Sequence, residues 1–317
     1  MKNKYIADLK PGDTLVNEPF LLQDAAYRQT KDGRTYLLYT VSDKTGQANG
    51  IYWDTPDDVS EWLRPGVVIL ITGRVNNYRE SLQVSATDMV QHLRPDMTDF
   101  LAASRRPQEE MVAELKREIG QLDQFWQALV AHILLDETFL ARFANAPAAR
   151  KMHHAYIGGL LEHTLSMAAV AHKLADHYPY VNRDLLLAGV LLHDVGKPVE
   201  YQVETAFDYS DDGRLVGHIV RGIVMVEQAA ADLGDFPPEL LRQLVHLIAA
   251  HHGTLEWGSP TVPKTLEAIL LHQIDLLDSR MQGFYDHWRN EGSNNLWTAK
   301  PSPILGTELR RPPGLER

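Results

Sequence analysis

The sequence of 317 residues contains no cysteine, so disulfide bonds and thiolate metal sites are both excluded. No uninterrupted apolar run approaches the ~20 residues that a membrane-spanning helix needs. Residues 1–8 are basic at the start but have no apolar signal core. The chain also has no internal repeat and no low-complexity tract. These absences predict a cytoplasmic protein without a membrane partner.

The sequence also lacks the basic surplus of a general nucleic-acid coat protein, because its net charge is −11. Residues 1–95 hold 11 Lys and Arg against 12 Asp and Glu, so nearly all of the negative charge falls on the remaining residues. The nearly neutral first part is therefore the better candidate for contact with a polyanion. Bound divalent cations would offset some of the charge on the acidic part.

Short strands separated by turn residues are predicted in the first part of the chain. We expect strands over 14–28, 35–41, 47–53, 67–76 and 81–91, with a short helix over 56–63 between the third and fourth strands. This order is typical of a five-stranded OB-type β-barrel, whose face and loops commonly bind single-stranded nucleic acid. The predicted OB domain covers residues 1–95.

Aromatic and basic residues on the predicted barrel indicate a surface for single strands, since bases stack on aromatic rings and phosphates pair with arginine. Most of these rings could instead fill the interior of a small barrel. The candidate substrate-binding residues are Tyr36, Tyr39, Arg74 and Arg79, with Tyr52, Trp53, Tyr78, Arg28 and Arg34 nearby.

The remainder of the chain reads as helical. A proline-bracketed linker is predicted over 96–108, a helical domain over 109–297, and an extended tail rich in Pro, Gly and Arg over 298–317. The helical pattern breaks between Glu200 and Val216, where a β-hairpin or ordered loop is expected. The fold class is thus multi-domain α and β.

Histidines and aspartates recur at helix ends in the second part. An apolar helix over 185–192 ends at His193 and Asp194, and we expect Gly196 to stop it in a left-handed conformation. For an isolated His-Asp pair, a buried ion pair is the ordinary interpretation. The candidate ligands on the other predicted helices are His163, His218, His251, His252 and Asp275.

Imidazole and carboxylate ligands without thiolate suit Mn, Fe, Co, Ni, Mg or Zn. Asp194 could bridge two ions about 3.5–4 Å apart, the separation used in two-metal phosphoester hydrolysis. Lys197 lies one helical turn beyond His193, so its ammonium could hold a phosphate, or it could simply complement the helix end. Glu162 and Asp278 are candidates to support the ligands from behind.

The order His163, His193-Asp194, Asp275 resembles the HD-domain metal-dependent phosphohydrolase superfamily. Four segments, 158–164, 193–197, 217–219 and 251–260, together resemble the YhaM-type 3′→5′ exoribonuclease family, in which an OB-type domain precedes the HD domain. The resemblance covers about residues 10 to 290.

The resemblance implies two divalent ions, with Mn or Co as the working metals. His163, His193, Asp194 and Asp275 would hold one ion, and Asp194 and His218 would share the other with His251 or His252. The sequence does not decide between these last two histidines. Single-stranded RNA is the implied substrate, with single-stranded DNA as a second candidate and His154 as a candidate substrate contact. Asp194 and Lys197 are the predicted catalytic residues.

Two other functions stay open on the sequence. The HD domain could hydrolyse a small nucleotide, such as a cyclic dinucleotide, or the chain could bind nucleic acid around a structural metal site. A structural site normally closes its coordination and needs no spare cation such as Lys197. The sequence is compatible with a homo-oligomer but does not specify one.

Overall fold

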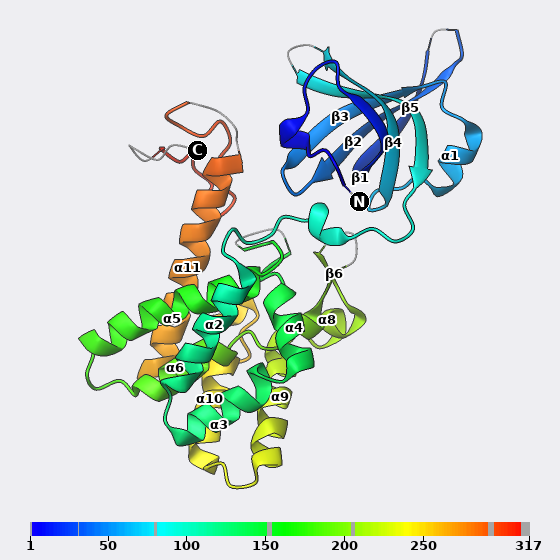
Figure 1. Ribbon diagram of the computed structural model, residues 1–317. Coiled ribbons are helices and arrows are strands. Elements are labelled where there is room, and N and C mark those ends of the chain that lie inside the picture. The colour runs from blue at the N-terminus through cyan, green and yellow to red at the C-terminus, as the bar shows by residue number, and fades with distance from the viewer. Residues whose placement is uncertain are drawn as a thin grey trace. The chain divides into compact units, whose positions relative to one another are not determined.

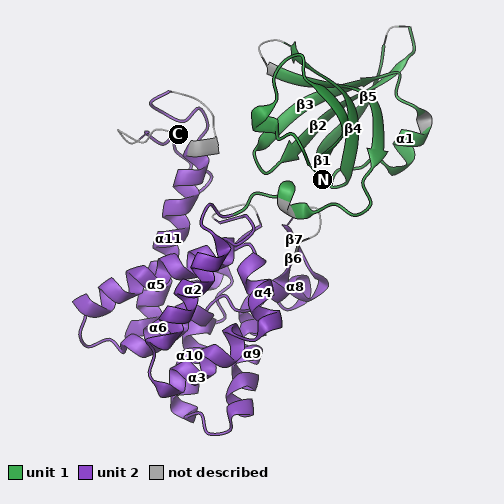
Figure 2. Cartoon of the chain, in the orientation of Figure 1, with its two compact units in different colours: residues 1–103, 203–206 green, residues 104–202, 207–317 purple. Residues whose placement is uncertain are grey.

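The protein is described by a computed structural model that covers residues 2–30, 32–78, 81–150, 154–203, 207–290 and 295–311. The chain divides into two compact units (Figures 1 and 2). Residues 1–103 with 203–206 form the first unit, and residues 104–202 with 207–317 form the second. The division falls inside the segment 96–108 that was expected to be a linker.

The first unit is a closed five-stranded barrel with the strand order β1-β2-β3-β5-β4. Neighbouring strands pair antiparallel, except that β3 and β5 run parallel. The strands are β1 (Thr14–Gln29), β2 (Thr35–Asp43), β3 (Gly46–Trp53), β4 (Val68–Tyr78) and β5 (Ser81–Gln91), and helix α1 (Asp57–Trp62) lies between β3 and β4. The predicted OB-type barrel is confirmed, with the short helix in the expected place.

Alternation along the strands fills the barrel, because successive side chains point to opposite faces. On β2, Leu37, Tyr39 and Val41 are buried, whereas Leu38 between them is exposed. A buried ion pair attaches the N-terminal segment to β2. Lys2 Nζ lies 3.2 Å from Asp43 Oδ2, and the same carboxylate oxygen accepts the backbone N–H of Ile6 at 2.8 Å.

The second unit is helical around one core, apart from a two-stranded hairpin of β6 (Tyr201–Val203), whose last residue is assigned to the first unit, and β7 (Phe207–Tyr209). This hairpin lies in the first half of the segment 200–216, where a hairpin or ordered loop was expected, but the second half of that segment is helical, as α8. The helices are α2 (Gln108–Gly120), α3 (Gln124–Leu134), α4 (Glu137–Asn145), α5 (Gly159–His177), α6 (Arg183–Leu192), α7 (Lys197–Glu200), α8 (Asp211–Leu215), α9 (His218–Leu233), α10 (Pro238–Ala250) and α11 (Leu266–Asn290).

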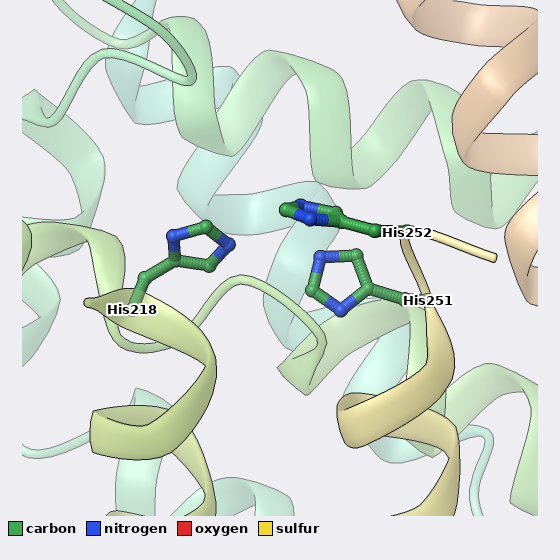
Figure 3. Close-up of side chains that lie close together, drawn as sticks. All are labelled: His218, His251 and His252. Atoms are coloured by element: carbon green, nitrogen blue, oxygen red, sulfur yellow. The ribbon is translucent and has the colours of Figure 1, made fainter. Parts of the chain in front are cut away.

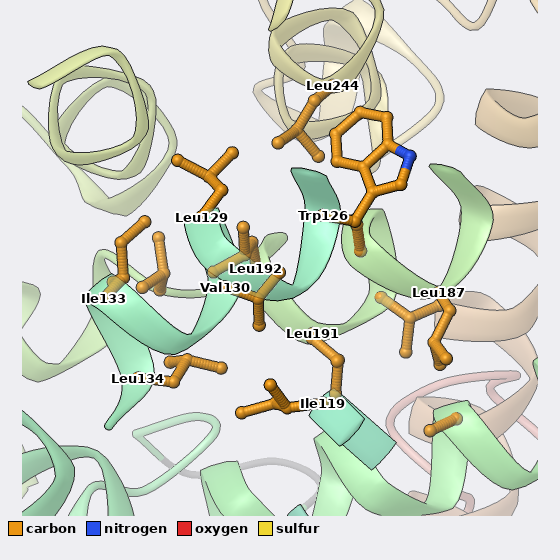
Figure 4. Close-up of a cluster of buried hydrophobic side chains, with 14 of the residues drawn as sticks. Ile119, Trp126, Leu129, Val130, Ile133, Leu134, Leu187, Leu191, Leu192 and Leu244 are labelled. Carbon is orange, nitrogen blue, oxygen red and sulfur yellow. The ribbon is translucent and has the colours of Figure 1, made fainter. Parts of the chain in front are cut away.

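Helix α6 forms the centre of this unit. All eight residues from Leu185 to Leu192 are buried, as expected for a helix that is apolar on every side. Figure 4 shows α6 side chains packed against those of α3, including Trp126 and Val130. The start of α6 is fixed by a side-chain cap, since the side chain of Asn182 accepts the N–H of Leu185 at 3.0 Å.

Among the described residues, no helix combines the length and the apolar character that crossing a bilayer would require.

Candidate metal centre and strand-binding surface

The end of α6 carries the first two ligand candidates into the interior. His193 is fully buried and Asp194 is 3% exposed. The expectation of a left-handed Gly196 is wrong: its φ is −77°, and the chain turns through Gly196 directly into α7. Glycine is needed there for space, because a Cβ would lie 2.1 Å from the carbonyl oxygen of His218. Pro198 is the second residue of α7 and lies in its first turn, where the missing N–H costs nothing.

Two groups of three side chains converge beside Asp194, and within each group the ligand atoms lie within 4.8 Å of one another. The first group comprises His163 from α5, His193 and Asp275 from α11. The second comprises His218 at the start of α9 with His251 and His252 at the end of α10; Figure 3 shows these three rings facing one another. Helices far apart in the sequence thus assemble all the predicted ligands into one centre.

Asp194 lies between the two groups. Its Oδ2 is 3.1 Å from His193 Nε2, whereas its Oδ1 is 3.5 Å from His218 Nε2 and 3.6 Å from His251 Nε2. One carboxylate oxygen therefore faces each group. This is the placement that a bridging ligand requires.

The other ring nitrogen of each histidine has a fixed acceptor. Nδ1 of His193, His251 and His252 lies 2.8 Å from the backbone oxygens of Val190, Ile248 and Trp257 respectively. Nδ1 of His163 lies 2.7 Å from Asp278 Oδ2, and Nδ1 of His218 lies 2.9 Å from Glu200 Oε1. Because Nδ1 must donate in each of these bonds, the lone pair of Nε2 is left for a metal ion.

The residues fit divalent cations. Among the described residues, several buried atoms facing the centre have no hydrogen-bond partner: Nε2 of His193, His218 and His251, and Oδ1 of Asp194. Buried polar groups are rarely left unsatisfied, and an ionised carboxylate least of all. Imidazole nitrogens and carboxylate oxygens suit Mn, Co, Fe, Ni, Mg or Zn.

Electrostatics favours the metal-binding protonation states of Asp194 and His251. Burial by itself would raise the pKa of the Asp194 carboxyl, but His193 and Lys197 beside it hold that pKa well below its ordinary value. Burial lowers the pKa of His251 well below its usual range, so this ring is neutral. Burial opposes the charge of Lys197, but the pKa of Lys197 is raised by Asp194, whose Oδ2 lies 2.5 Å from the lysine Nζ.

His154, expected to contact substrate, is 3% exposed and lies behind His163. Its Nε2 is 3.0 Å from Asp278 Oδ2 and its Nδ1 is 2.8 Å from the Tyr156 hydroxyl. The ring also borders a cavity of about 500 Å³ between α5 and α11, which Glu162 and Tyr285 line as well. Contact between His154 and substrate stays a prediction, whereas its contact with Asp278 is observed.

Sequence reasoning missed Glu200. This residue stands 18 positions before His218 and reaches it only because α7, the β6–β7 hairpin and α8 fold the intervening chain back. Nothing in the sequence around Glu200 indicates this contact, because both its burial and its approach to His218 arise from the tertiary fold. Asp278 was anticipated as a support, since it lies one helical turn beyond Asp275 on α11.

The barrel presents an aromatic pair on its outer surface. Tyr36 on β2 lies opposite Trp53 on β3, and their ring centroids are 5.0 Å apart at an interplanar angle of 34°. Trp53 is 53% exposed, and Arg28 pairs with Tyr36 from the other side on β1. Base stacking on rings with a cation nearby is the usual chemistry of single-strand binding.

The structure places the other predicted substrate-binding residues of the barrel in different environments. Tyr39 is wrong as a stacking residue: it is 3% exposed, and its hydroxyl donates to the Val84 oxygen at 2.8 Å inside the barrel. Tyr52 is likewise buried. Arg74 is exposed on β4. Arg79 lies outside the described residues.

Three family models match parts of the chain. A model described as HD domain matches residues 160–280, and one described as OB-fold nucleic acid binding domain matches residues 25–91. A model of a putative helicase matches residues 91–182. The first two matches coincide with the helices that carry the candidate ligands and with the barrel, so the protein is an OB-fold barrel joined to an HD domain.

Curated relatives match most of the chain. A protein of Oceanobacillus iheyensis named 3′-5′ exoribonuclease YhaM is 34% identical over 265 residues, which cover 82% of this chain and 83% of the relative. The protein of the same name from Bacillus subtilis is 32% identical, covering 84% and 85%. The chain belongs to the YhaM 3′-5′ exoribonuclease family. Among solved structures, the second OB-fold domain of replication protein A from Methanococcus maripaludis is 21% identical and covers 30% of this chain and 99% of its own, with a TM-score of 0.24.

Proposed function

We propose that this chain is a divalent-metal-dependent 3′→5′ exonuclease that hydrolyses single-stranded RNA to nucleoside monophosphates, with single-stranded DNA as a second substrate. The observation that carries the proposal is the convergence of two ligand groups on the two oxygens of Asp194. The family of 3′-5′ exoribonucleases to which the chain belongs supports the direction and the substrate class.

Two divalent ions held here, Mn or Co before Fe, Ni, Mg or Zn, would activate a water and offset charge on the phosphoryl oxygens. The proposed ligands of one ion are His163, His193, Asp194 and Asp275. Asp194 is shared with the second set, His218, His251 and His252. All three of these rings lie close enough together to serve, and each has its Nδ1 already occupied.

Asp194 and Lys197 are the proposed catalytic residues. Asp194 would be a ligand shared by both ions, because its two oxygens face histidines of different ligand groups. Lys197 places a permanent positive charge 2.5 Å from that carboxylate, in a side chain that is 10% exposed. An ammonium so placed can hold a phosphate of the strand as a point charge.

The barrel would gather the strand. We propose that bases stack on Tyr36 and Trp53 and that the phosphates pair with Arg28 and Arg74, on the domain of residues 1–95. The HD domain of residues 109–297 would then receive the 3′ end. The separation of a near-neutral first part from an acidic second part supports this division of labour.

The test is product analysis on three substrates with Mn²⁺: an RNA with a free 3′ hydroxyl, the same RNA with a blocked 3′ end, and a cyclic dinucleotide. We expect nucleoside monophosphates from the first and little reaction with the other two. Rapid hydrolysis of the cyclic dinucleotide with an intact RNA would instead assign the centre to small nucleotides. Strand binding without hydrolysis of any substrate would leave a binding protein with a structural metal site.

A further inference from the structure

Each ligand group contains one histidine that is held by a carboxylate, buried in the case of Glu200 and half-buried in the case of Asp278, instead of a backbone carbonyl. In the first group, His163 is held by Asp278; in the second, His218 is held by Glu200. Peptide carbonyls hold the Nδ1 atoms of the other three histidines. A carboxylate partner fixes the ring orientation and also raises the basicity of the metal-binding nitrogen, which a neutral carbonyl does less strongly.

We propose that Glu200 and Asp278 are positioning residues that serve different ions, Glu200 through His218 and Asp278 through His163. The inference rests on the metal centre of the proposed function. In addition, each carboxylate orients a ligand of one ion only, so that the affinity for one ion can be lowered without changing the affinity for the other.

Glu200 accepts two hydrogen bonds from His218. Its Oε1 lies 2.9 Å from the ring Nδ1 and 3.2 Å from the backbone nitrogen of the same residue, so it fixes both the ring and the first turn of α9. The backbone of Glu200 is itself fixed, since its oxygen accepts the N–H of Ser210 at 2.9 Å. Gly213 packs so closely against that oxygen that a Cβ would lie 2.2 Å away.

The side chain of Glu200 is poorly explained by stability alone. The residue is 7% exposed, and its Oε2 has no hydrogen-bond partner among the described residues. A buried carboxylate that uses only one oxygen costs free energy that a neutral side chain would avoid. The bond to a metal-facing histidine gives a reason for a charge in this position.

Asp278 is more firmly embedded. Its Oδ2 lies 2.7 Å from His163 Nδ1 and 3.0 Å from His154 Nε2, and its Oδ1 accepts the hydroxyl of Ser166. His154 has a left-handed backbone, with φ of +50°, and Gly159 fits against it where a Cβ would lie 2.0 Å from the His154 oxygen. The surroundings of Asp278 are thus built to hold it, and through it His163.

The two carboxylates lie on different elements, at the end of α7 and within α11, and hold histidines that belong to different ligand groups. Loss of a partner that orients a metal ligand typically costs about 10- to 100-fold in metal affinity. We therefore expect Glu200→Ala and Asp278→Ala each to weaken one ion by about this factor and to leave the other ion bound.

The experiment is calorimetric titration of the metal-free full-length protein with Mn²⁺, together with metal analysis after desalting. It compares the wild type, both single Ala variants and the double variant. Glu227→Ala, which removes an exposed carboxylate from α9, is the control for a change of net charge. Glu200→Gln and Asp278→Asn keep an acceptor oxygen but lose the charge, so they should restore the ring orientation and only part of the affinity; they also test the inference if an Ala variant fails to fold.

We expect two ions in the wild type and in Glu227→Ala, one retained tight ion in each single variant, and none in the double variant. A double variant that retains one tight ion would show that both carboxylates act on the same site and would overturn the inference. Single variants that bind both ions as the wild type does would also overturn it, while leaving the proposed function intact. A wild type that binds no Mn²⁺ would contradict the metal centre of the proposed function itself.

Discussion

Tyr36 and Tyr39 offer a matched test of the barrel surface, because they lie three residues apart on β2 but on opposite faces. Tyr36 stands outside against Trp53, and Tyr39 lies within the core. Replacing Tyr36 with Ala removes a stacking ring, which costs about 1–3 kcal/mol of binding, so the Kd for RNA should rise about 5- to 150-fold. Replacing Tyr39 with Ala should cost about 3–5 kcal/mol of stability, since it empties a buried site.

The assay is fluorescence anisotropy of a labelled single-stranded RNA, in an Asp194→Ala background that prevents degradation, with thermal unfolding measured in parallel. Tyr36→Ala should bind weakly and unfold normally, whereas Tyr39→Ala should unfold at a lower temperature. The conservative Tyr39→Phe loses only the bond to the Val84 oxygen and should retain binding. Wild-type RNA affinity in Tyr36→Ala would refute the assignment of this face to strand binding.

Three further predictions concern stability and the metal-free centre. Asp43→Ala should destabilise the barrel by about 3–5 kcal/mol, because it leaves the buried Lys2 ammonium bonded to the Pro19 oxygen but without a carboxylate to balance its charge; a melting temperature unchanged from wild type would contradict this. Gly196→Ala should lower stability by about 1–3 kcal/mol and weaken Mn²⁺ binding, since the added Cβ would meet the His218 oxygen; calorimetry and thermal unfolding would both show it, and unchanged values would remove the steric argument. Burial opposes the charge on His163, but Asp275 and Asp278 raise its pKa from 6.5 to about 9 without metal. The ion pairs of protonated His163 with these carboxylates therefore stabilise the metal-free protein fully below pH 6.5, and this stabilisation is lost as the pH rises through about 9. Mn²⁺ binding at pH 7.5 should release a proton from His163, visible as a buffer-dependent binding enthalpy, and an enthalpy independent of the buffer would be the contrary result.

The sequence predicts the barrel well because alternation and turn residues are local signals. It does not separate Tyr36 from Tyr39, since both are tyrosines on one strand and only the strand register decides which ring faces the core. The structure supplies that register: Tyr36 lies opposite Trp53, while Tyr39 lies opposite Gly50, which leaves room for its ring.

The ligand set was predictable for a different reason. His163, Asp194 and Asp275 were recognised through their chemistry and their order in the chain, although nothing local shows that they meet. Supporting residues carry less signal: Asp278 shares a helix face with Asp275, but Glu200 reaches His218 only through the tertiary fold. The turn at Gly196 was misjudged because its constraint is a neighbouring carbonyl and not its own backbone conformation.

The most direct test of the central claim is a time course on a 5′-labelled single-stranded RNA with Mn²⁺, for the wild type and Asp194→Ala, with and without EDTA. The shared position of Asp194 between both ligand groups predicts a descending ladder with the wild type alone. The ladder should vanish with EDTA, and Asp194→Ala should leave the RNA intact while still binding it. Degradation by Asp194→Ala at the wild-type rate, or a ladder that persists in EDTA, would contradict hydrolysis at this metal centre.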